Sequence, residues 1–348
     1  MTKPNYLCID IGGTKLCTGL SDGQHVWGIT AQSIHKGIPN LLRQLQRCIQ
    51  THNATVSAIL IGCPGNIIDD HIAAGSAQNM GTFPGEFDGF NLRQTLASYT
   101  TKPIAVFNDA QAQMAGAYLD LRERLPDVTA IGYIGPGTGL GGGFARVGKS
   151  GYHPVTDGHI FDIALEVPPS CRTFPDSDGE FGGDAPRTKR VLAFGENEKK
   201  IERADALSIP QSPGDTQTNT AENLLSGRAF HTLTGLSATD ASATNPDKYI
   251  AVIQEFGYTL ATLIRHLHTG TVSKPAAHAW TTDEIAFVTT VKHYMLGGGL
   301  GTSSPFGDWL LASARRYLHD GGIPVEIYPI PDTQRAALVG LVVLYERR

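Results

Sequence analysis

The sequence lacks three features that would each define a class of protein. No apolar run approaches membrane-spanning length, and the first residues pass into a strand pattern without the long apolar stretch of a signal peptide. Lys and Arg total 28 against 33 Asp and Glu, a formal net charge of -5. Because binding to a phosphate backbone needs a concentrated excess of basic side chains, we expect no nucleic acid and no membrane among the partners, and small molecules instead.

Cysteine is also scarce. The 348 residues include only five, an odd number, widely spaced and mostly among apolar neighbours: Cys8, Cys17, Cys48, Cys63 and Cys171. This distribution is typical of reduced thiols packed in a core rather than of a disulfide framework, so we expect a cytoplasmic protein. With 41% hydrophobic residues and 18% charged ones, the chain is long enough for two domains with cores of their own.

Two glycine-threonine loops are present, with an Asn-Asp pair between them. The loops are Asp10–Lys15 and Gly135–Gly139, and the pair lies in Phe107–Ala110. Each loop separates two short apolar runs, which predicts the turn of a β-hairpin. Glycines let the backbone approach an anion with N–H groups pointing inward, and threonine adds a hydroxyl donor. The pattern therefore indicates phosphate binding at two loops, with a carboxylate between them that could act as a base.

The order of the other elements predicts an α/β protein. In chain order, apolar periodicity favours a helix over 38–50, a strand over 56–62, a loop over 63–91, a short helix over 92–99 and a strand over 104–107. It then favours helices over 110–121, 221–233 and 248–268, a strand at 294–296, a further helix, a strand at 325–328 and a last helix over 333–345. The second hairpin repeats the plan of the first, which predicts two related halves. Pro, Gly, Ser, Asp and charge dominate about 165–220, an expected surface insertion.

Together these motifs resemble those of bacterial glucokinases and the wider ROK-type family of sugar kinases and repressors, in the actin-like ATPase superfamily. The resemblance rests on Asp10–Lys15 as the first phosphate motif, Asn108 and Asp109 as the catalytic pair, Gly137–Gly141 as the second phosphate motif, and Gly297–Gly299 as the adenosine-side loop. Their order and spacing extend over nearly the whole chain. The family implies an α/β, actin-like ATPase (ribonuclease H-like) fold of two domains with an inter-domain cleft, ATP and Mg²⁺ as cofactors, and a homodimer.

The resemblance also implies domain boundaries. Residues 1–115 would form a small N-terminal α/β domain, completed by a C-terminal helix over 333–348. Residues 116–332 would form the large α/β domain, with the insertion at about 165–220.

Weaker matches extend the resemblance to the sugar. Asp157-Gly158-His159 lies where the family has Glu-x-Gly-His, and Glu222 begins a segment whose glutamate contacts the sugar in the family. Gly65 and Asn79 resemble further sugar-facing positions. Thr156 stands where the family glutamate is expected, so either Asp157 takes over a hydroxyl contact or the pocket is altered.

A second departure concerns metal. The zinc-binding Cys-x-Cys-Gly-x-x-Gly-Cys stretch of many family members is absent, and Cys171 alone cannot supply a tetrahedral site. We therefore expect no structural zinc. The segment from His159 to Glu222 is also longer than in typical bacterial glucokinases.

Each site residue also has a simpler interpretation. Asp109 is the expected general base and Asn108 the expected partner of neighbouring hydroxyls, yet an Asn-Asp pair can merely cap the next helix. Asp10 is expected to hold Mg²⁺ through water, yet it can simply close its hairpin. His159 can be a hydrogen-bonded structural histidine, and Glu222 can complement a helix dipole.

The phosphate-binding residues share an open alternative, because either glycine loop alone is a common turn. Taken together, they would supply fixed donors to the phosphates. The residues concerned are Gly12, Gly13, Thr14, Lys15, Gly137, Thr138 and Gly139, with Gly297, Gly298 and Gly299 on the adenosine side.

Two other motifs match the consensus sequences of known nucleotide-binding sites. Gly143–Ser150 fits a P-loop and Gly137–Gly142 fits a dinucleotide fingerprint, but both motifs require a following helix, and the sequence predicts strand and hairpin turn instead. A group of basic residues in the insertion indicates a solvated face, with an anionic ligand as the alternative: Arg187, Lys189, Arg190, Lys199, Lys200 and Arg203.

The resulting interpretation is an ATP-dependent hexose kinase, with glucose phosphorylated at its 6-hydroxyl as the resemblance implies. Three alternatives stay open: a kinase for another hexose or an N-acetylhexosamine, a sugar-sensing regulator that needs no catalysis, and an actin-like or chaperone-like ATPase. The regulator is disfavoured because Asp109 is kept and no helix-turn-helix precedes the first strand. Whether ATP or polyphosphate is the donor is left open by the sequence.

Overall fold

Two five-stranded sheets are built on one plan. The computed structural model describes residues 5–77, 80–148, 151–156, 159–165 and 219–347. The first sheet has the order β3-β2-β1-β4-β7 and the second β10-β9-β8-β11-β12. In each, three antiparallel strands continue into two parallel ones, which confirms the predicted repeat. The strands are β1 (Tyr6–Ile11), β2 (Lys15–Ser21), β3 (Val26–Ser33), β4 (Ala58–Cys63), β7 (Ile104–Asn108), β8 (Ala130–Pro136), β9 (Leu140–Gly148), β10 (Gly151–Pro154), β11 (His293–Leu296) and β12 (Glu326–Pro329).

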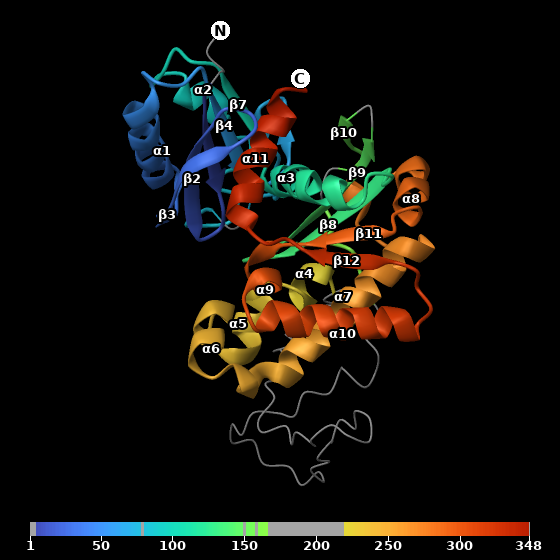
Figure 1. Cartoon of the computed structure of the whole chain (residues 1–348). Helices are drawn as coiled ribbons and strands as arrows, with labels where there is room; N and C mark the ends of the chain where they lie inside the picture. Colours follow the sequence, from blue (N-terminus) through green and yellow to red (C-terminus); the bar gives the residue numbers. More distant parts are fainter. Residues whose placement is uncertain (1–4, 78–79, 149–150, 157–158, 166–218, 348) are drawn as a thin grey trace.

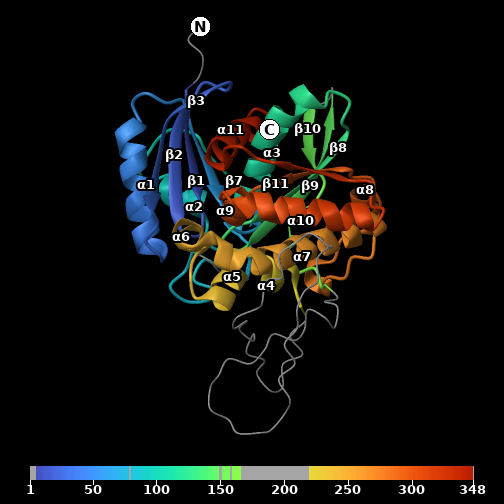
Figure 2. The same ribbon diagram turned by 60° about the horizontal axis from the view of Figure 1, so that its bottom comes forward.

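Helices separate and cover the two sheets (Figure 1). Helices α3 (Asp109–Arg124) and α11 (Thr333–Tyr345) lie between the sheets. Helices α1 (Ile38–His52) and α2 (Leu92–Leu96) cover the outer face of the first sheet. Helices α7 (Ile250–Thr269) and α10 (Phe306–Asp320) cover the outer face of the second sheet, as Figure 2 also shows. The last helix of the chain thus returns to the first sheet.

Strand periodicity sorts the side chains of β1 between two cores. Leu7, Ile9 and Ile11 pack toward α1, whereas Tyr6 and Cys8 pack toward α3 and α11. Because successive side chains of a strand point to opposite faces, Asp10 shares the face of Cys8. The alternation therefore carries a carboxylate toward the middle layer at the end of a buried strand.

Helices α3 and α11 cross where both have a glycine. A Cβ atom on Gly116 would lie 1.8 Å from the carbonyl oxygen of Ala336, and one on Gly340 would lie 1.7 Å from that of Ala112. No carbon atom fits at these distances, so the crossing depends on the two missing side chains.

We expect Gly340→Ala to lower the free energy of unfolding by about 1–3 kcal/mol, since overpacking a tight contact forces the backbone to shift. Chemical denaturation measures the change. Gly299→Ala is the matched stability control, because its Cβ would meet nothing within 4 Å. Equal stability of the two variants would contradict the close crossing.

Several shorter elements differ from the sequence-based expectation. The helix expected over 221–233 is two helices, α4 (Ala221–Leu224) and α5 (Gly227–Thr234), because the Ser226 hydroxyl accepts the N–H of Ala229 and caps a new start. The expected loop 63–91 contains a small hairpin, β5 (Ile67–Ile68) and β6 (His71–Ile72). The sequence reading missed α6 (Ala238–Thr244) and α8 (Thr282–Thr289). The expected helix over 248–268 is preceded by the 3₁₀ turn η2 (Pro246–Tyr249), and a second such turn is η3 (Ala276–His278).

Neither of the two other nucleotide-site motifs, Gly143–Ser150 and Gly137–Gly142, has the structural context that such a site requires. β9 and β10 pair as an antiparallel hairpin across 148–151, so the strand-to-helix context of a P-loop is missing. The fingerprint at 137–142 likewise enters β9 rather than a helix. In the described part of the chain, no helix is both long enough and apolar enough to span a bilayer. The expected insertion at about 165–220 lies outside the described residues except at its two ends. Its basic residues and Cys171 also lie outside them.

Candidate functional site

Two aspartates stand near the carboxyl ends of two parallel strands, β1 and β7, which flank β4. Asp10 is the penultimate residue of β1 and pairs in register with Gly62 of β4, while Asp109 directly follows β7 on the other side of β4. A Cβ on Gly62 would lie 3.0 Å from Asp10 Oδ1 and 3.7 Å from the Cα of Asp109. The strand between the two acids therefore has no side chain at Gly62 to separate them. Ligands of open α/β sheets bind at this end of the strands.

The surroundings raise the pKa of both acids. Burial raises the pKa of Asp10 to about 8, and the nearby charge of Asp109 adds to the effect. Burial raises the pKa of Asp109 to about 6, against the opposing hydrogen bond from the Ala110 N–H. At neutral pH Asp109 is thus mostly ionised and able to accept a proton, whereas Asp10 needs a nearby cation to favour its charged form.

The donor set at Asp10 fits the Mg²⁺ that the sequence resemblance implies. Asp10 Oδ1 is buried and has no hydrogen-bond partner among the residues described, so a bound cation would supply the missing partner. No group of three or more His, Cys, Asp or Glu suited to a metal occurs in the described ranges. Mg²⁺ in phosphate sites needs only one or two carboxylates, because waters and phosphate oxygens complete its shell.

Asn108 caps α3, which is the simpler of its two predicted roles, and it also binds the loop at Gly65. Its Oδ1 accepts the N–H of Gln111 at 2.9 Å and caps α3. Its Nδ2 donates to the carbonyl oxygen of Gly65 at 2.8 Å. The cap fixes the start of the helix that carries Asp109, and the second bond holds the predicted sugar-facing loop at Gly65 beside it.

The two glycine-threonine loops, both predicted to bind phosphate, contact each other. A Cβ on Gly13 would lie 3.1 Å from the Cβ of Thr138, and one on Gly141 would lie 3.1 Å from that of Ala110. The Gly12 N–H donates to the carbonyl oxygen of Lys15 at 2.8 Å, which closes the first turn. Thr14 and Lys15 are exposed. Both loops thus border the aspartate pair, one from each half.

The third glycine segment lies against the second loop, Gly135–Gly139. The Gly297 N–H donates to the carbonyl oxygen of Ile134 at 3.0 Å, and Gly298 has a φ of 70°. A Cβ on Gly298 would lie 2.5 Å from the carbonyl carbon of Pro136. Gly298 and Gly299 begin α9 (Gly298–Thr302), so the expected loop is a junction between strand and helix.

Two of the predicted sugar-side residues, His159 and Glu222, are connected through Phe161. The buried His159 ring packs 5.1 Å from the ring of Phe161, and the Phe161 carbonyl oxygen accepts the N–H of Glu222 at 2.9 Å. Thr156 is buried, and its hydroxyl has no partner in the described part of the chain. Gln111, near the start of α3, reaches the carbonyl oxygen of Thr156 at 3.5 Å. Asn79 and Asp157 lie outside the described residues.

A buried ionic cluster beside His159 was missed by sequence reasoning. Asp162 Oδ1 lies 3.1 Å from Lys274 Nζ, and Asp162 Oδ2 lies 2.6 Å from His278 Nδ1. Lys274 Nζ also donates to the carbonyl oxygen of His159 and lies 4.6 Å from the centre of the Trp280 ring. The cluster fastens the segment after His159 to the segment before α8.

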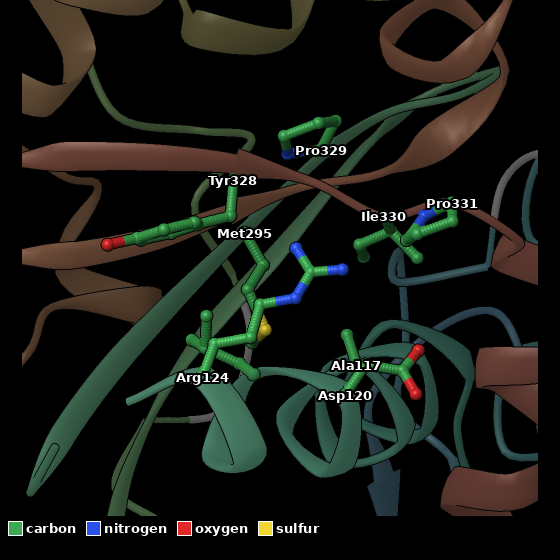
Figure 3. Close-up of a pocket in the computed structure, with 9 residues that line it drawn as sticks. Ala117, Asp120, Arg124, Met295, Tyr328, Pro329, Ile330 and Pro331 are labelled. Carbon is green, nitrogen blue, oxygen red and sulfur yellow. The ribbon is translucent and has the colours of Figure 1, made fainter. Parts of the chain in front are cut away.

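A small hollow beside the later part of α3 is not part of this site (Figure 3). It lies between the second half of α3, at Asp120 and Arg124, and the strand ends at Met295, Tyr328 and Ile330. Its open space of about 20 Å³ is on the scale of one or two water molecules. Asp120 is eleven residues beyond Asp109, which is about 16 Å along a helix.

Comparison with known proteins agrees with this arrangement. Residues 6–171 match the ROK family. The N-acetylmannosamine kinase of Escherichia coli strain SE11 is 34% identical over 146 residues, which are 41% of this chain and 48% of that protein. The chain thus spans about half the length of the curated relatives it matches.

Solved structures cover the whole fold. A ROK family glucokinase from Streptomyces griseus, in complex with glucose and AMPPNP, superposes with a TM-score of 0.61 at 16% identity, over 99% of this chain and 100% of that one. A ROK hexokinase from Thermus thermophilus gives a TM-score of 0.55 at 18% identity, over 99% and 98%. The predicted fold class is confirmed: this chain has the actin-like ATPase fold of these ROK sugar kinases, and its residues 6–171 are similar to the ROK family.

Proposed function

We propose that this protein is an ATP-dependent kinase of a hexose, with glucose and its 6-hydroxyl as the first candidate. The observation that carries the proposal is the convergence of Asp10, Asp109 and both glycine-threonine loops at the ends of β1, β4 and β7. A phosphate cradle beside a carboxylate of raised pKa is what phosphoryl transfer to a neutral hydroxyl requires.

In this reaction Asp109 accepts the proton of the attacking hydroxyl. As the new bond forms between that oxygen and the γ-phosphorus, the bond from the γ-phosphorus to its bridging oxygen breaks, and ADP leaves with that electron pair. The N–H groups of Gly13, Thr138 and Gly139 would stabilise the phosphate oxygens in place of water, while those of Gly12 and Gly137 close their own turns. Asp10 would hold Mg²⁺, which neutralises phosphate charge when bound.

We infer that the sugar contacts Gly65, Asn108, His159 and Glu222. A hydrogen bond joins Asn108 to Gly65, and Phe161 connects the other two, since its ring packs on His159 and its carbonyl oxygen accepts the N–H of Glu222. Asn79 and Asp157 stay predicted sugar contacts. An N-acetylhexosamine is the alternative substrate, because the curated relative of 34% identity is an N-acetylmannosamine kinase.

A coupled assay of ADP release tests the proposal. The panel contains glucose, mannose, fructose, allose, N-acetylmannosamine and N-acetylglucosamine, each with ATP and Mg²⁺. We expect ADP release that depends on one of these sugars. ADP release that ignores the sugar would favour the ATPase alternative, sugar binding without turnover would favour the regulator, and neither binding nor turnover with any sugar would reject the proposed function.

A further inference from the structure

Arg228 connects Glu222, a predicted sugar contact, to the second glycine-threonine loop, Gly135–Gly139. It is the second residue of α5, whose start lies directly on the loop: the Gly227 N–H donates to the carbonyl oxygen of Gly137 at 2.6 Å, and the Arg228 N–H donates to that of Thr138 at 3.2 Å. A Cβ on Gly227 would lie only 2.6 Å from the Gly137 oxygen. The backbone of Arg228 and the phosphate loop therefore form one unit.

The side chain of Arg228 reaches in the other direction. Its Nη2 pairs with Oε1 of Glu222 in the first turn of α4. The start of α4 is fixed in turn by hydrogen bonds to the segment after His159, from Ala221 N–H to Ile163 and from Glu222 N–H to Phe161. One residue thus touches a predicted sugar contact with its guanidinium group and a predicted phosphate contact with its backbone.

The pair between Arg228 and Glu222 can exchange partners at small cost. The Arg228 side chain is 49% exposed and that of Glu222 17% exposed. Ion pairs open to solvent contribute little to stability, commonly about 0–1 kcal/mol. A sugar hydroxyl that binds Glu222 therefore competes with the guanidinium group on nearly equal terms.

We propose that Arg228 couples sugar binding to nucleotide binding. In the sugar-free protein the guanidinium group is held by Glu222. When a sugar hydroxyl takes Glu222, the released positive charge lies beside the loop at Gly137 and Thr138, where it favours a phosphate. Arg228 is then a positioning residue through which each ligand raises the affinity for the other, as reciprocal linkage requires. The inference rests on the proposed function.

Calorimetry measures the affinity for a non-hydrolysable ATP analogue with Mg²⁺, with and without the hexose that gives the highest turnover in the panel above. For the wild type we expect the sugar to tighten nucleotide binding about fivefold or more. In Arg228→Met we expect the same nucleotide affinity without sugar, and a coupling factor near one. Arg228→Lys should restore part of the coupling, because it restores the charge.

Two further variants sharpen the test. Glu222→Gln frees Arg228 at all times, so it should bind the nucleotide more tightly without sugar and respond little to sugar. Arg93→Met is the matched control, since it removes a similarly exposed pair, Arg93 with Asp70 at 2.6 Å, and should keep the full coupling. Undiminished coupling in Arg228→Met would overturn the inference while leaving the kinase intact. A wild type without hexose-dependent turnover would instead reject the proposed function.

Discussion

Replacing Asp109 with Asn is expected to lower kcat by about 10²- to 10⁴-fold, the range that a positioned general base contributes. The carboxamide is close to isosteric but cannot accept the hydroxyl proton. Asp109 Oδ1 accepts a hydrogen bond from the Ala110 N–H, and an amide oxygen can accept it as well, so the fold and sugar affinity should be retained. Steady-state kinetics and calorimetric titration with the sugar measure the two quantities.

The same variant should change the pH profile. In the wild type kcat/KM is expected to fall as the pH drops below about 6, since the pKa of Asp109 is about 6 and only its ionised form can accept a proton. The variant should lose this acidic limb. Asp127→Asn, an exposed carboxylate just after α3, is the control and should behave as the wild type. Near-normal turnover in Asp109→Asn would remove Asp109 from the role of base.

Replacing Lys274 with Met is expected to lower the free energy of unfolding by about 3–5 kcal/mol, because breaking a buried ion pair leaves an uncompensated charge. The Lys274 side chain is 2% exposed and that of its partner Asp162 is 9% exposed. The variant leaves the ring of His278, whose Nδ1 lies 2.6 Å from Asp162 Oδ2, as the remaining polar partner of Asp162. Denaturant unfolding measures the loss.

The double variant Asp162→Asn with Lys274→Met separates pair loss from packing loss. We expect it to be less destabilised than the sum of the two single variants, because residues in one network are not additive. Lys248→Met is the control, since Lys248 is exposed and its removal should cost little. Strict additivity in the double variant would contradict a functioning ion pair.

The cluster around Lys274 also marks the limit of what the sequence predicts. Asp162 and His278 are 116 residues apart, and no local pattern connects them. The hairpins at Gly12 and Gly137, by contrast, were predictable because a glycine turn between apolar runs is a local signal. The capping box of Thr281 and Glu284 at the start of α8 is also a local signal, from which α8 could have been predicted.

The site was predictable to the same extent as its local patterns. Asp10, Asp109 and both loops follow from strand ends and glycine turns. Their convergence depends on the parallel pairing of β1, β4 and β7, which the sequence suggests only through the repeated plan. The link from Arg228 to Glu222 was not foreseen, because it spans a helix break at Ser226 that periodicity alone does not reveal. The domain boundaries and the roles of the individual site residues stay predictions.

The middle layer has a consequence for the synthesis of the chain. Its core combines Tyr6 and Cys8 of the first strand with Leu341 and Leu344 of the last helix. A nascent chain that has only reached β7 therefore has one covered face of its first sheet and one face still open to solvent. Helix α3 covers part of that apolar face, and the cover is complete only when α11 has also been synthesised. The first sheet should consequently complete its folding only after α11 has been made, rather than in order from its first strand onward.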